Sequence, residues 1–396
     1  MNTLYKPFSK FVLFISFLGY LSIQCSKDGD PSASGSGSTS GAASTPKKCS
    51  NCTFVVAASQ GTIDGTALGV KPGDTICLNA AFKYGTLTFK NIVGTAVKPV
   101  IITNCDGTVN IALTGKPFNL KTSNSKYFRI TGGDTEKSYG IRLSGSTANG
   151  IVLTDFSTNF EVDHMEVFKV GFAGIMAKTD PTCDDATIRG HFTMRNVSFH
   201  DNYIHDTQGE GFYIGHSFYG GETVSGCGVR LPHTIEGIDI YNNHVVRSGW
   251  DGIQMSCATK NARVFGNTVE DYAVLNKAEQ QNGILIGGGS GGVCFGNFVN
   301  GGTGNGICTF GLGDNLFHDN IVINAGQKGM FCDVRGVPTG NGFKFINNTV
   351  INPKEEGIAI YSFTLPSNVC INNIIVNPGT FSTYKESAYI RINKNA

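Results

Sequence analysis

An excess of charge of either sign is missing from this chain. Its 396 residues include 31 Lys and Arg against 30 Asp and Glu, which gives a formal net charge of +1. A protein that binds nucleic acid or an anionic membrane through its overall field needs a large basic excess. We therefore expect no nucleic-acid partner, and any charge that matters for function must be local.

Amphipathic helical stretches and closed metal motifs are also scarce. The lack of helical periodicity excludes leucine-rich and ankyrin arrays. No spacing of cysteine and histidine resembles a structural zinc site, because Cys49-Ser50-Asn51-Cys52 stands without a second pair. The turn signals mark a longer repeat rather than a series of hairpins, so a β-sandwich does not fit.

The first 25 residues have the pattern of an export signal. Lys6 and Lys10 accompany an apolar stretch over 11–23, which is too short for a comfortable transmembrane helix and is followed by Cys25. Residues 21–25, Leu-Ser-Ile-Gln-Cys, resemble the lipobox of bacterial lipoproteins. We expect lipidation of Cys25 and a flexible Ser/Gly-rich tether over 26–52. The protein would then be anchored in the outer membrane or at the cell surface; without lipidation it would be secreted or periplasmic.

An internal repeat over residues 53–396 predicts the fold. A short apolar strand, an Asn, one further residue and then Val or Ile recur together, with the Asn at positions 202, 243, 267, 297, 320, 348 and 373. Nine residues after five of these Asn residues comes a Gly followed by an apolar residue, at Gly211, Gly252, Gly306, Gly329 and Gly357. Asn suits a bend because it tolerates left-handed backbone angles, and stacked Asn side chains can form an amide ladder. The apolar, variable, apolar pattern after each Gly is typical of a strand with one inward face. The repeat therefore predicts an all-β solenoid, a single-stranded parallel β-helix.

Two stretches resemble the pectate-lyase-like β-helix superfamily. Val-Lys-Pro-Gly-Asp-Thr-Ile at 70–76, Tyr84-Gly85, Gly94-Thr95 and Pro-Val-Ile-Ile at 99–102 resemble the first coils of polysaccharide lyases of the chondroitinase B and alginate lyase type. The coils from Gly140 onward resemble the generic right-handed β-helix repeat region. The resemblance implies a right-handed solenoid and an acidic polysaccharide as ligand. It gives no subfamily, because the chain lacks Gly-His-Gly, Asn-Thr-Asp with a downstream Arg-Ile-Lys, and Arg-x-Pro-x-x-Arg.

Stacked coils place equivalent residues in columns about 4.8 Å apart. Glu210 and Asp251 both directly precede a repeat Gly, so two carboxylates would adjoin and would need a cation or a shared proton. A second column alternates in charge and also fits a surface salt-bridge ladder; it contains Lys169, Asp206, Arg247 and Asp271. The coils from 160 to 256 have the longest spacings, most of the histidines and the only Trp, Trp250. Long insertions on a solenoid usually build a binding face.

The leading hypothesis for function is a polysaccharide lyase that cleaves a uronic-acid polymer by β-elimination. Such an enzyme needs a group that neutralises the uronate carboxylate, a base and an acid. The expected catalytic residues are Arg247, Lys169, His205 and Tyr213, and the expected substrate-binding residues are Trp250, Gln254 and His216. Glu210 and Asp251 are the expected ligands of a calcium ion, which favours oxygen donors. We expect Glu210, Asp251, Arg247, Tyr213 and His205 to line one outer groove of a monomeric protein.

Three alternatives stay open. The protein could be a glycoside hydrolase that uses Glu210 and Asp251 as its carboxylate pair. It could be a C5-epimerase with much the same groups as a lyase. It could instead be a non-catalytic solenoid that binds glycans at the surface. The outward stripe of Leu285, Cys308 and Phe331 is expected to be covered by a loop rather than to bind ligand.

The twelve cysteines predict both disulfides and free thiols. Cys183 and Cys227 lie in turn-rich insertions of adjacent coils, so we expect a disulfide with the two Cα atoms within about 7 Å. Lipidation of Cys25 would leave an odd number of cysteines, and at least one thiol would then be free. Cys294 and Cys370 occupy inward positions and are expected to act as small core residues.

The expected lipid anchor predicts how the protein partitions. Replacing Cys25→Ala should move the protein from the membrane fraction to the soluble fraction, because the acyl chains can no longer be attached. Immunoblots of the two fractions check this. Unchanged partitioning of the variant would contradict the anchor.

Overall fold

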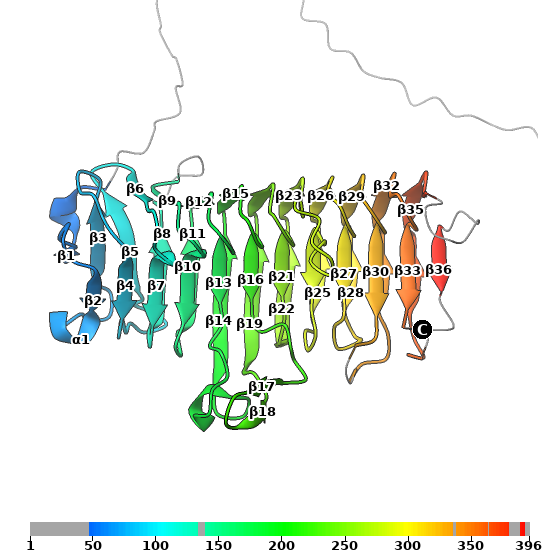
Figure 1. Cartoon of the computed structure of the whole chain (residues 1–396), viewed down its shortest axis with the longest axis horizontal. Helices are drawn as coiled ribbons and strands as arrows, with labels where there is room; N and C mark the ends of the chain where they lie inside the picture. Colours follow the sequence, from blue (N-terminus) through cyan, green and yellow to red (C-terminus); the bar gives the residue numbers. More distant parts are fainter. Residues whose placement is uncertain (1–46, 134–138, 336–337, 363, 380–388, 393–396) are drawn as a thin grey trace, which may run out of the picture. The chain divides into compact units, whose positions relative to one another are not determined.

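The computed structural model describes residues 47–133, 139–335, 338–362, 364–379 and 389–392. These residues lie in one compact unit that extends from Ser44 to Ala396. The export signal, Cys25 and the tether up to residue 46 lie outside the described residues. The unit is built almost entirely from short parallel strands stacked in successive coils (Figure 1). It confirms the predicted single-stranded right-handed parallel β-helix.

Three parallel sheets run the length of the unit, and each complete coil passes through sheet B, then sheet A, then sheet C. Sheet A contains β1 (Phe54–Val55), β3 (Thr75–Asn79), β5 (Val100–Cys105), β8 (Lys126–Thr131), β11 (Thr158–Asp163), β14 (Thr193–His200), β19 (Thr234–Tyr241), β22 (Ala258–Phe265), β25 (Val293–Phe295), β28 (Leu316–His318), β31 (Lys344–Ile346) and β34 (Val369–Ile371). Sheet B contains β2 (Thr62–Asp64), β4 (Leu87–Lys90), β7 (Phe118–Ser123), β10 (Asn149–Thr154), β13 (Ile175–Ala177), β16 (Phe212–Ile214), β21 (Ile253–Met255), β24 (Ile284–Ile286), β27 (Ile307–Thr309), β30 (Met330–Asp333), β33 (Ile358–Tyr361) and β36 (Ile390–Ile392). Sheet C contains β6 (Val109–Ala112), β9 (Ile141–Ser144), β12 (Met165–Phe168), β15 (Tyr203–His205), β20 (His244–Val246), β23 (Thr268–Glu270), β26 (Phe298–Asn300), β29 (Ile321–Ile323), β32 (Thr349–Ile351) and β35 (Ile374–Val376).

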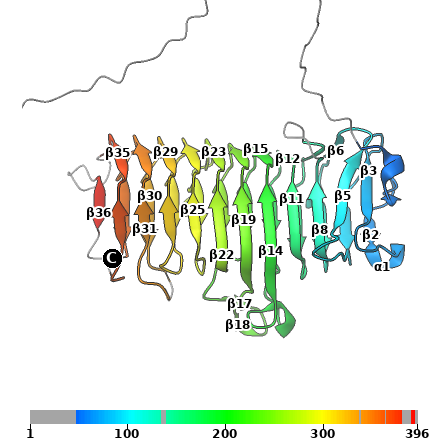
Figure 2. The same ribbon diagram turned by 180° about the vertical axis from the view of Figure 1, so that it is seen from behind.

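The remaining elements are short. A helix α1 (Gly65–Leu68) and a 3-10 turn η1 (Cys49–Asn51) accompany the first coils, and a second 3-10 turn η2 (Asp185–Thr187) lies in an insertion. The strands β17 (Glu222–Val224) and β18 (Gly228–Arg230) form an antiparallel hairpin that projects beyond the stack (Figure 2). Among the described residues, no helix is long and apolar enough to cross a membrane.

The core of the solenoid consists of the inward side chains of the three sheets. On sheet B the predicted inward pairs are at most 4% exposed; they are Phe212/Ile214, Ile253/Met255, Ile284/Ile286, Ile307/Thr309, Met330/Cys332 and Ile358/Ile360. Each side chain packs on its counterparts in the coils before and after, so burial grows with the number of coils. The period-two pattern after each Gly is confirmed as one inward face.

The predicted amide ladder fills the turn between sheets A and C. The Nδ2 atom of Asn243 donates to Oδ1 of Asn267 at 3.0 Å and to the carbonyl of Phe199 at 2.9 Å. Its own Oδ1 accepts from both the backbone and the side chain of Asn202. The same contacts repeat through Asn297, Asn320, Asn348 and Asn373. These buried amides fix the register of neighbouring coils.

The backbone of the ladder differs from the sequence expectation in one respect. The ladder Asn residues do not have left-handed dihedrals; the residue directly before each of them does, as at Asp201 (φ 52°), Asn242 (φ 52°) and Gly266 (φ 63°). The reason is that the Asn side chain must point inward to join the ladder, so the sharp bend falls one residue earlier. Asp, Asn and Gly are the residues that accept that bend most readily.

Cysteines behave in two ways. Cys183 and Cys227 form the predicted disulfide, with 5.5 Å between the Cα atoms. Two more disulfides, Cys49–Cys105 and Cys52–Cys77, tie residues 49–52 to the first coils, so part of the segment assigned to the tether is fastened to the solenoid. The described free thiols include the expected Cys294, which is buried, and Cys370, which is partly buried. Three disulfides in the described residues are typical of a protein exported to an oxidising compartment.

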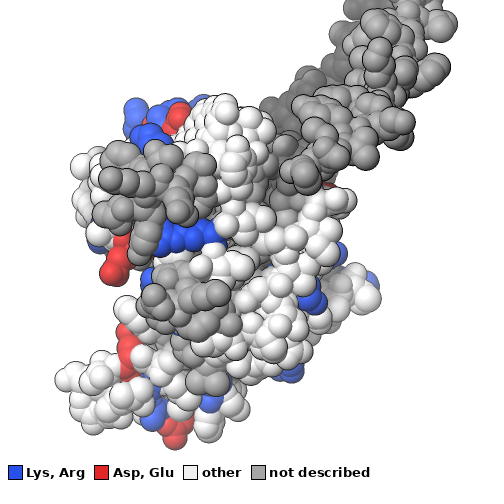
Figure 3. Space-filling model, turned by 90° about the vertical axis from the view of Figure 1, so that its right-hand side faces the viewer, with Lys and Arg blue, Asp and Glu red and all other residues white. Residues whose placement is uncertain are grey.

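Charge on the surface is mixed, as the net charge of +1 suggests. On the face seen in Figure 3, Lys and Arg as well as Asp and Glu side chains are scattered among uncharged ones, and neither sign covers a continuous area among the residues shown in colour. Elsewhere on the coils several surface charges are paired, such as Arg263 with Asp239 and Arg247 with Asp206. Exposed pairs of this kind contribute little to stability.

The amide ladder predicts an unequal response to alanine. Asn243→Ala should lower the free energy of unfolding by about 2–4 kcal/mol, because it leaves buried groups of Asn202, Asn267 and Phe199 without partners. Urea unfolding followed by circular dichroism measures this. The control is Asn110→Ala, which removes an exposed amide from the extended backbone of strand β6 and should cost about 0.5 kcal/mol or less. Equal losses in the two variants would contradict the structural role of the buried ladder.

Candidate active site

The outward face of sheet B carries a polar cluster in the long-insertion coils. The strand register aligns the outward residues Met176, Tyr213, Gln254 and Leu285 on adjacent strands β13, β16, β21 and β24. Tyr213 is partly exposed, whereas Gln254 is 1% exposed and Leu285 is 6% exposed. Cys308, the next residue of this column, is also buried, at 1% exposure. The stripe that begins at Leu285 is therefore covered over its first two residues, as expected, while Phe331 stays partly exposed.

Tyr213 lies at the centre of this cluster. The ammonium of Lys178 lies over its ring, 4.9 Å from the centroid, and also pairs with Asp180 at 2.7 Å. The Tyr213 hydroxyl is 3.0 Å from the Oγ of Ser217, which in turn accepts from Nε2 of Gln254 at 2.9 Å. The pKa of Lys178 is raised: burial opposes the charged form, but the charges of Tyr213 and Asp180 outweigh it. Lys178 is therefore a fixed positive charge beside a phenol whose hydroxyl belongs to a hydrogen-bond chain.

His216 supports the wall of the site. Its Nδ1 accepts from the backbone N–H of Phe218 at 3.1 Å, so the proton resides on Nε2, which contacts a carboxylate oxygen of Glu222 at 3.0 Å. Burial and the nearby charge of Lys178 lower the pKa of His216. Both ring nitrogens are thus occupied by the loop that carries the residue. His216 is 4% exposed and holds that loop in place; its predicted contact with substrate stays a prediction.

Two insertions flank the cluster. On one side, the segments after β13 and β16 are joined by the Cys183–Cys227 disulfide. On the other side, the segment between β23 and β24 is fastened to the preceding coil, since the backbone N–H groups of Ala273 and Leu275 donate to the carbonyls of Trp250 and Gly249. This second insertion carries Lys277, whose ammonium lies 3.5 Å from the centroid of the Trp250 ring. The disulfide-linked segments belong to the long-spacing coils over 160–256, whereas the second flanking segment, over 271–283, follows them.

Glu210 and Asp251 lie in register beneath this region but are buried, at 2% and 0% exposure. One oxygen of Asp251 accepts from the backbone and the side chain of Asn282, at 2.6 Å and 3.0 Å. Glu210 Oε2 and Asp251 Oδ2 have no hydrogen-bond partner among the described residues. Burial raises the pKa of Glu210 to about 8, with a further contribution from the charge of Asp251, and burial raises the pKa of Asp251 to about 7. Two adjacent buried carboxyls of this kind favour a shared proton.

Calcium does not fit this pair by itself. Calcium takes about six to eight oxygen ligands, while two carboxylates offer at most four, and Asn282 already occupies one of them. Among the described residues, no third acidic side chain joins Glu210 and Asp251 in a group with ligand spacing. An acidic group with such spacing lies instead on the outer face of sheet A, where Glu161, Asp163 and His200 meet. There the Arg129 guanidinium already pairs with Glu161 and with Asp163.

The predicted residues Arg247 and His205 do not join Tyr213. His205 ends strand β15 of sheet C, where its ring stacks between Phe168 and Tyr203 and its nitrogens contact Asp206 and Glu166. The guanidinium of Arg247 is paired with Asp206, at 2.6 Å and 2.9 Å. The single groove expected for the five residues is therefore divided between two places.

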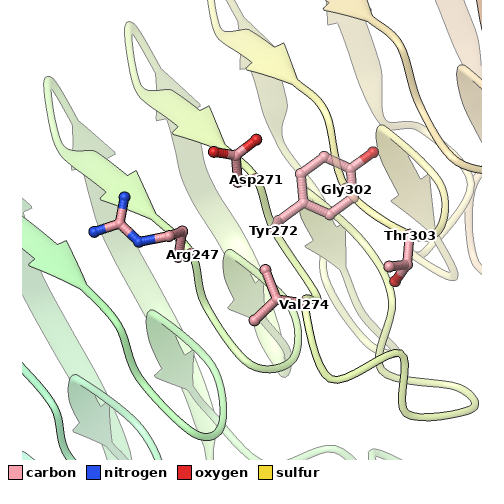
Figure 4. Close-up of a pocket in the computed structure, with 6 residues that line it drawn as sticks. All are labelled: Arg247, Asp271, Tyr272, Val274, Gly302 and Thr303. Atoms are coloured by element: carbon pink, nitrogen blue, oxygen red, sulfur yellow. The ribbon is translucent and has the colours of Figure 1, made fainter.

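Arg247 lines a pocket of its own (Figure 4). This cavity of about 440 Å³ lies in the turns that follow sheet C and is lined by Arg247, Asp271, Tyr272, Val274, Gly302 and Thr303. Lys169 is an exposed residue of the same column, one coil before Asp206. All four charged residues of that column have left-handed dihedrals, with φ between 49° and 54°. All four lie at the same tight turn of successive coils, which explains why they recur at equivalent positions of the repeat. The pair of Asp206 and Arg247 is a surface salt bridge, which was the alternative to a catalytic role for this column.

Sequence reasoning missed Lys178, Ser217, Phe172 and Lys277. Phe172 packs edge-on against both Tyr213 (5.8 Å between centroids) and Trp250 (5.3 Å), so it connects two residues that had been singled out separately. Lys178 directly follows strand β13, and Ser217 comes two residues after the Gly that ends β16. Polar residues directly after a sheet B strand were the available signal.

The comparisons with known proteins agree with this fold. Residues 232–396 match the family model described as right handed beta helix region. No curated protein matches the chain. Among solved structures, the chain is similar to alginate lyase from Paenibacillus sp. str. FPU-7, with a TM-score of 0.51 and 16% identity, over 86% of this chain and 100% of that one.

Two further solved structures are similar to this chain with lower TM-scores. They are the mannuronan C-5 epimerase AlgE4 A-module of Azotobacter vinelandii (TM-score 0.49, 12% identity, 87% of this chain and 98% of that one) and the GH136 lacto-N-biosidase of Eubacterium ramulus (TM-score 0.46, 12% identity, 77% and 62%). The family model and the alginate lyase structure show that the chain has the fold of a right-handed parallel β-helix. Identities this low show the fold and leave the reaction to be argued from the site.

The buried carboxyl pair predicts a specific dependence of stability on pH. A carboxyl whose pKa is raised on folding binds its proton more tightly in the folded state, so its stabilising effect is complete below the ordinary pKa near 4.5 and is lost as pH rises to about 8. Glu210→Gln should therefore reduce the fall in Tm between pH 5 and pH 8.5 by roughly 2–4 °C. Thermal unfolding at both pH values measures this.

The matched control is Glu279→Gln, because Glu279 is an exposed carboxylate on the insertion that carries Lys277. This change should leave the fall in Tm as it is in the wild type. A chelator that lowers the Tm of the wild type but not of Glu210→Gln would speak for a bound cation and against the shared proton.

Proposed function

We propose that this protein is a polysaccharide lyase that cleaves a uronic-acid polymer by β-elimination. The observation that carries the proposal is the pairing of Lys178 with Tyr213 on the outward face of sheet B. A partly exposed phenol and a fixed ammonium lie together between two insertions. Only the similarity in fold to an alginate lyase adds to this, and it supports the scaffold rather than the chemistry.

In the proposed reaction a base removes the proton from the carbon next to the uronate carboxyl. The electron pair forms a double bond to the neighbouring carbon, and the glycosidic oxygen on that carbon leaves and takes up a proton. We assign both proton transfers to the oxygen of Tyr213, which Ser217 and Gln254 hold in a hydrogen-bond chain. As the phenolate it removes the carbon-bound proton, and the hydroxyl so formed donates that proton to the glycosidic oxygen as it leaves, which restores the phenolate. The ammonium of Lys178 stabilises the negative charge that develops on the uronate carboxylate.

This assignment retains Tyr213 in a catalytic role and gives the neutralising role, expected for Arg247 or Lys169, to Lys178. Trp250 borders the same region and remains the proposed substrate contact. Gln254 and His216 are buried, so we propose that they support Tyr213 and the adjoining loop rather than contact the substrate as expected. Glu210 and Asp251 lie beneath the surface, where a neutral or singly charged pair keeps the electrostatic field of Lys178 available to an anionic sugar. No step of the reaction requires a metal ion at these two carboxyls.

The exported polymer-degrading role also agrees with the rest of the chain. The disulfides are those of an oxidising compartment, and the export signal with Cys25 would place the enzyme at the outer membrane or cell surface. The proposed substrate is therefore a polysaccharide met outside the cytoplasm. We propose that the protein acts on it as a monomer.

A panel of polysaccharides tests the reaction class. Incubation with alginate, pectate or chondroitin should raise the ultraviolet absorbance, because only a lyase creates a conjugated double bond. New reducing ends without that absorbance would indicate a glycoside hydrolase instead. A changed uronate composition without chain cleavage would indicate a C5-epimerase, and retention of polymer without any product would indicate a binding protein.

The assigned proton transfer predicts the effect of removing the hydroxyl oxygen of Tyr213. Tyr213→Phe should lower kcat on the active polymer by about 100-fold or more while the Tm stays unchanged, since the ring packing against Phe172 is kept and only the hydroxyl is lost. Initial rates of ultraviolet absorbance measure this. Tyr241→Phe, on the outer face of sheet A, is the matched control and should keep full activity. If Tyr213→Phe also kept full activity, the assignment would be overturned.

A further inference from the structure

A row of three aromatic rings crosses the candidate site and has a lysine at each end. Phe172 packs edge-on against Trp250 at one side and against Tyr213 at the other. The Lys178 ammonium lies over the Tyr213 ring, and the Lys277 ammonium lies over the Trp250 ring. The proposed reaction uses the Lys178 end of this row. The Lys277 end has no part in it so far.

Lys277 differs from the other cations of the site. Lys178 is paired with Asp180, whereas Lys277 is exposed and has no carboxylate within ion-pair distance among the described residues. Its position is nevertheless defined, because the insertion that carries it is fastened by backbone hydrogen bonds to Trp250 and Gly249. An ammonium on the face of Trp is also held by the quadrupole of the ring. Lys277 is therefore a positioned cation that lacks an anionic partner.

The two lysines face the same region from opposite insertions. The positive charges of both Lys277 and Lys178 act on the buried Glu210 and oppose the rise of its pKa that burial causes. Lys277 therefore lies near the part of sheet B where Tyr213 and Glu210 lie, although it is far from them in the sequence. A polymer bound across Tyr213 would pass close to Trp250.

We propose that Lys277 and Trp250 form a binding subsite for the carboxylate of a second acidic sugar, next to the sugar whose bond is broken. This inference rests on the proposed function and adds to it a preference for consecutive uronate residues. The anionic group pairs with the Lys277 ammonium, and the Trp250 ring holds that ammonium in place. The subsite contributes binding and takes no part in the proton transfer.

Trp250 makes this inference testable without turnover, because it is the only Trp of the chain. Titration of the wild-type protein with a short oligouronate should change the tryptophan fluorescence until it saturates, and added salt should weaken the binding. A neutral oligosaccharide of the same length should leave the fluorescence unchanged. The probes are oligomers of the uronates in alginate and pectate.

Lys277→Gln removes the charge and should weaken oligouronate binding about fivefold to tenfold. On the polymer it should raise KM by a similar factor and change kcat less than about twofold, because binding is lost equally from ground state and transition state. Lys277→Arg should restore most of the affinity. The matched control is Arg335→Gln, since Arg335 is another exposed cation over an aromatic ring, 3.8 Å from the centroid of Phe310, outside this site.

The outcomes separate the subsite from the proposed reaction. Fluorescence changes that depend on Lys277, without any conjugated product from the polymers, support the subsite and overturn the lyase. Turnover with an unchanged KM in Lys277→Gln overturns the subsite and leaves the lyase intact. Equal losses of affinity in Lys277→Gln and Arg335→Gln indicate general attraction of anions and also overturn the subsite.

Discussion

Hydrogen bonding between successive coils determines where every other side chain of this protein lies. The backbone of each strand pairs with the strands of the coils before and after, and the buried Asn ladder from Asn202 to Asn373 adds a second set of directional contacts at one turn. A slip of one residue would leave several buried amides without partners and would turn the apolar residues of sheet B outward. Because such a slip would cost this free energy, the register is kept from coil to coil, and equivalent residues lie directly above one another.

This register has an electrostatic consequence at Glu210 and Asp251. Stacking places the two carboxyls on adjacent coils whether or not that is favourable, and burial then disfavours their charged forms. The column that contains them continues with two amides: Nδ2 of Asn282 donates to Asp251, and Nδ2 of Asn305 donates to Oδ1 of Asn282. Beyond the two amides the column becomes charged again at Lys328 and Glu356, which pair with each other, whereas Glu210 and Asp251 have no cationic partner at ion-pair distance among the described residues. The carboxyl pair lies beneath the part of sheet B to which Lys178 and Lys277 contribute positive charge.

Predictions about this region were correct where they depended on the spacing of the repeat. They were wrong where they depended on the sheet from which a side chain points outward. The register of Glu210 with Asp251, the inward pairs of sheet B and the disulfide between Cys183 and Cys227 all follow from counting residues between coils. Placing His205 and Arg247 beside Tyr213 required knowing on which of three sheets each side chain points outward. His205 lies on sheet C and Tyr213 on sheet B, although only eight positions separate them in the sequence.

The sequence by itself determined the solenoid. Its repeat has strands that bury one face and bends that need Asn or Gly, and stacking successive coils buries all of these faces against one another. It also indicated a candidate functional region, since long insertions and the only Trp fall in the same coils. Only the tertiary structure decided which residues meet there. Lys178, Ser217, Phe172 and Lys277 come from different turns, and their distances to Tyr213 and Trp250 depend on how each insertion folds back onto sheet B. Such folding is set by contacts between segments that are distant in the chain, which no local pattern or spacing records.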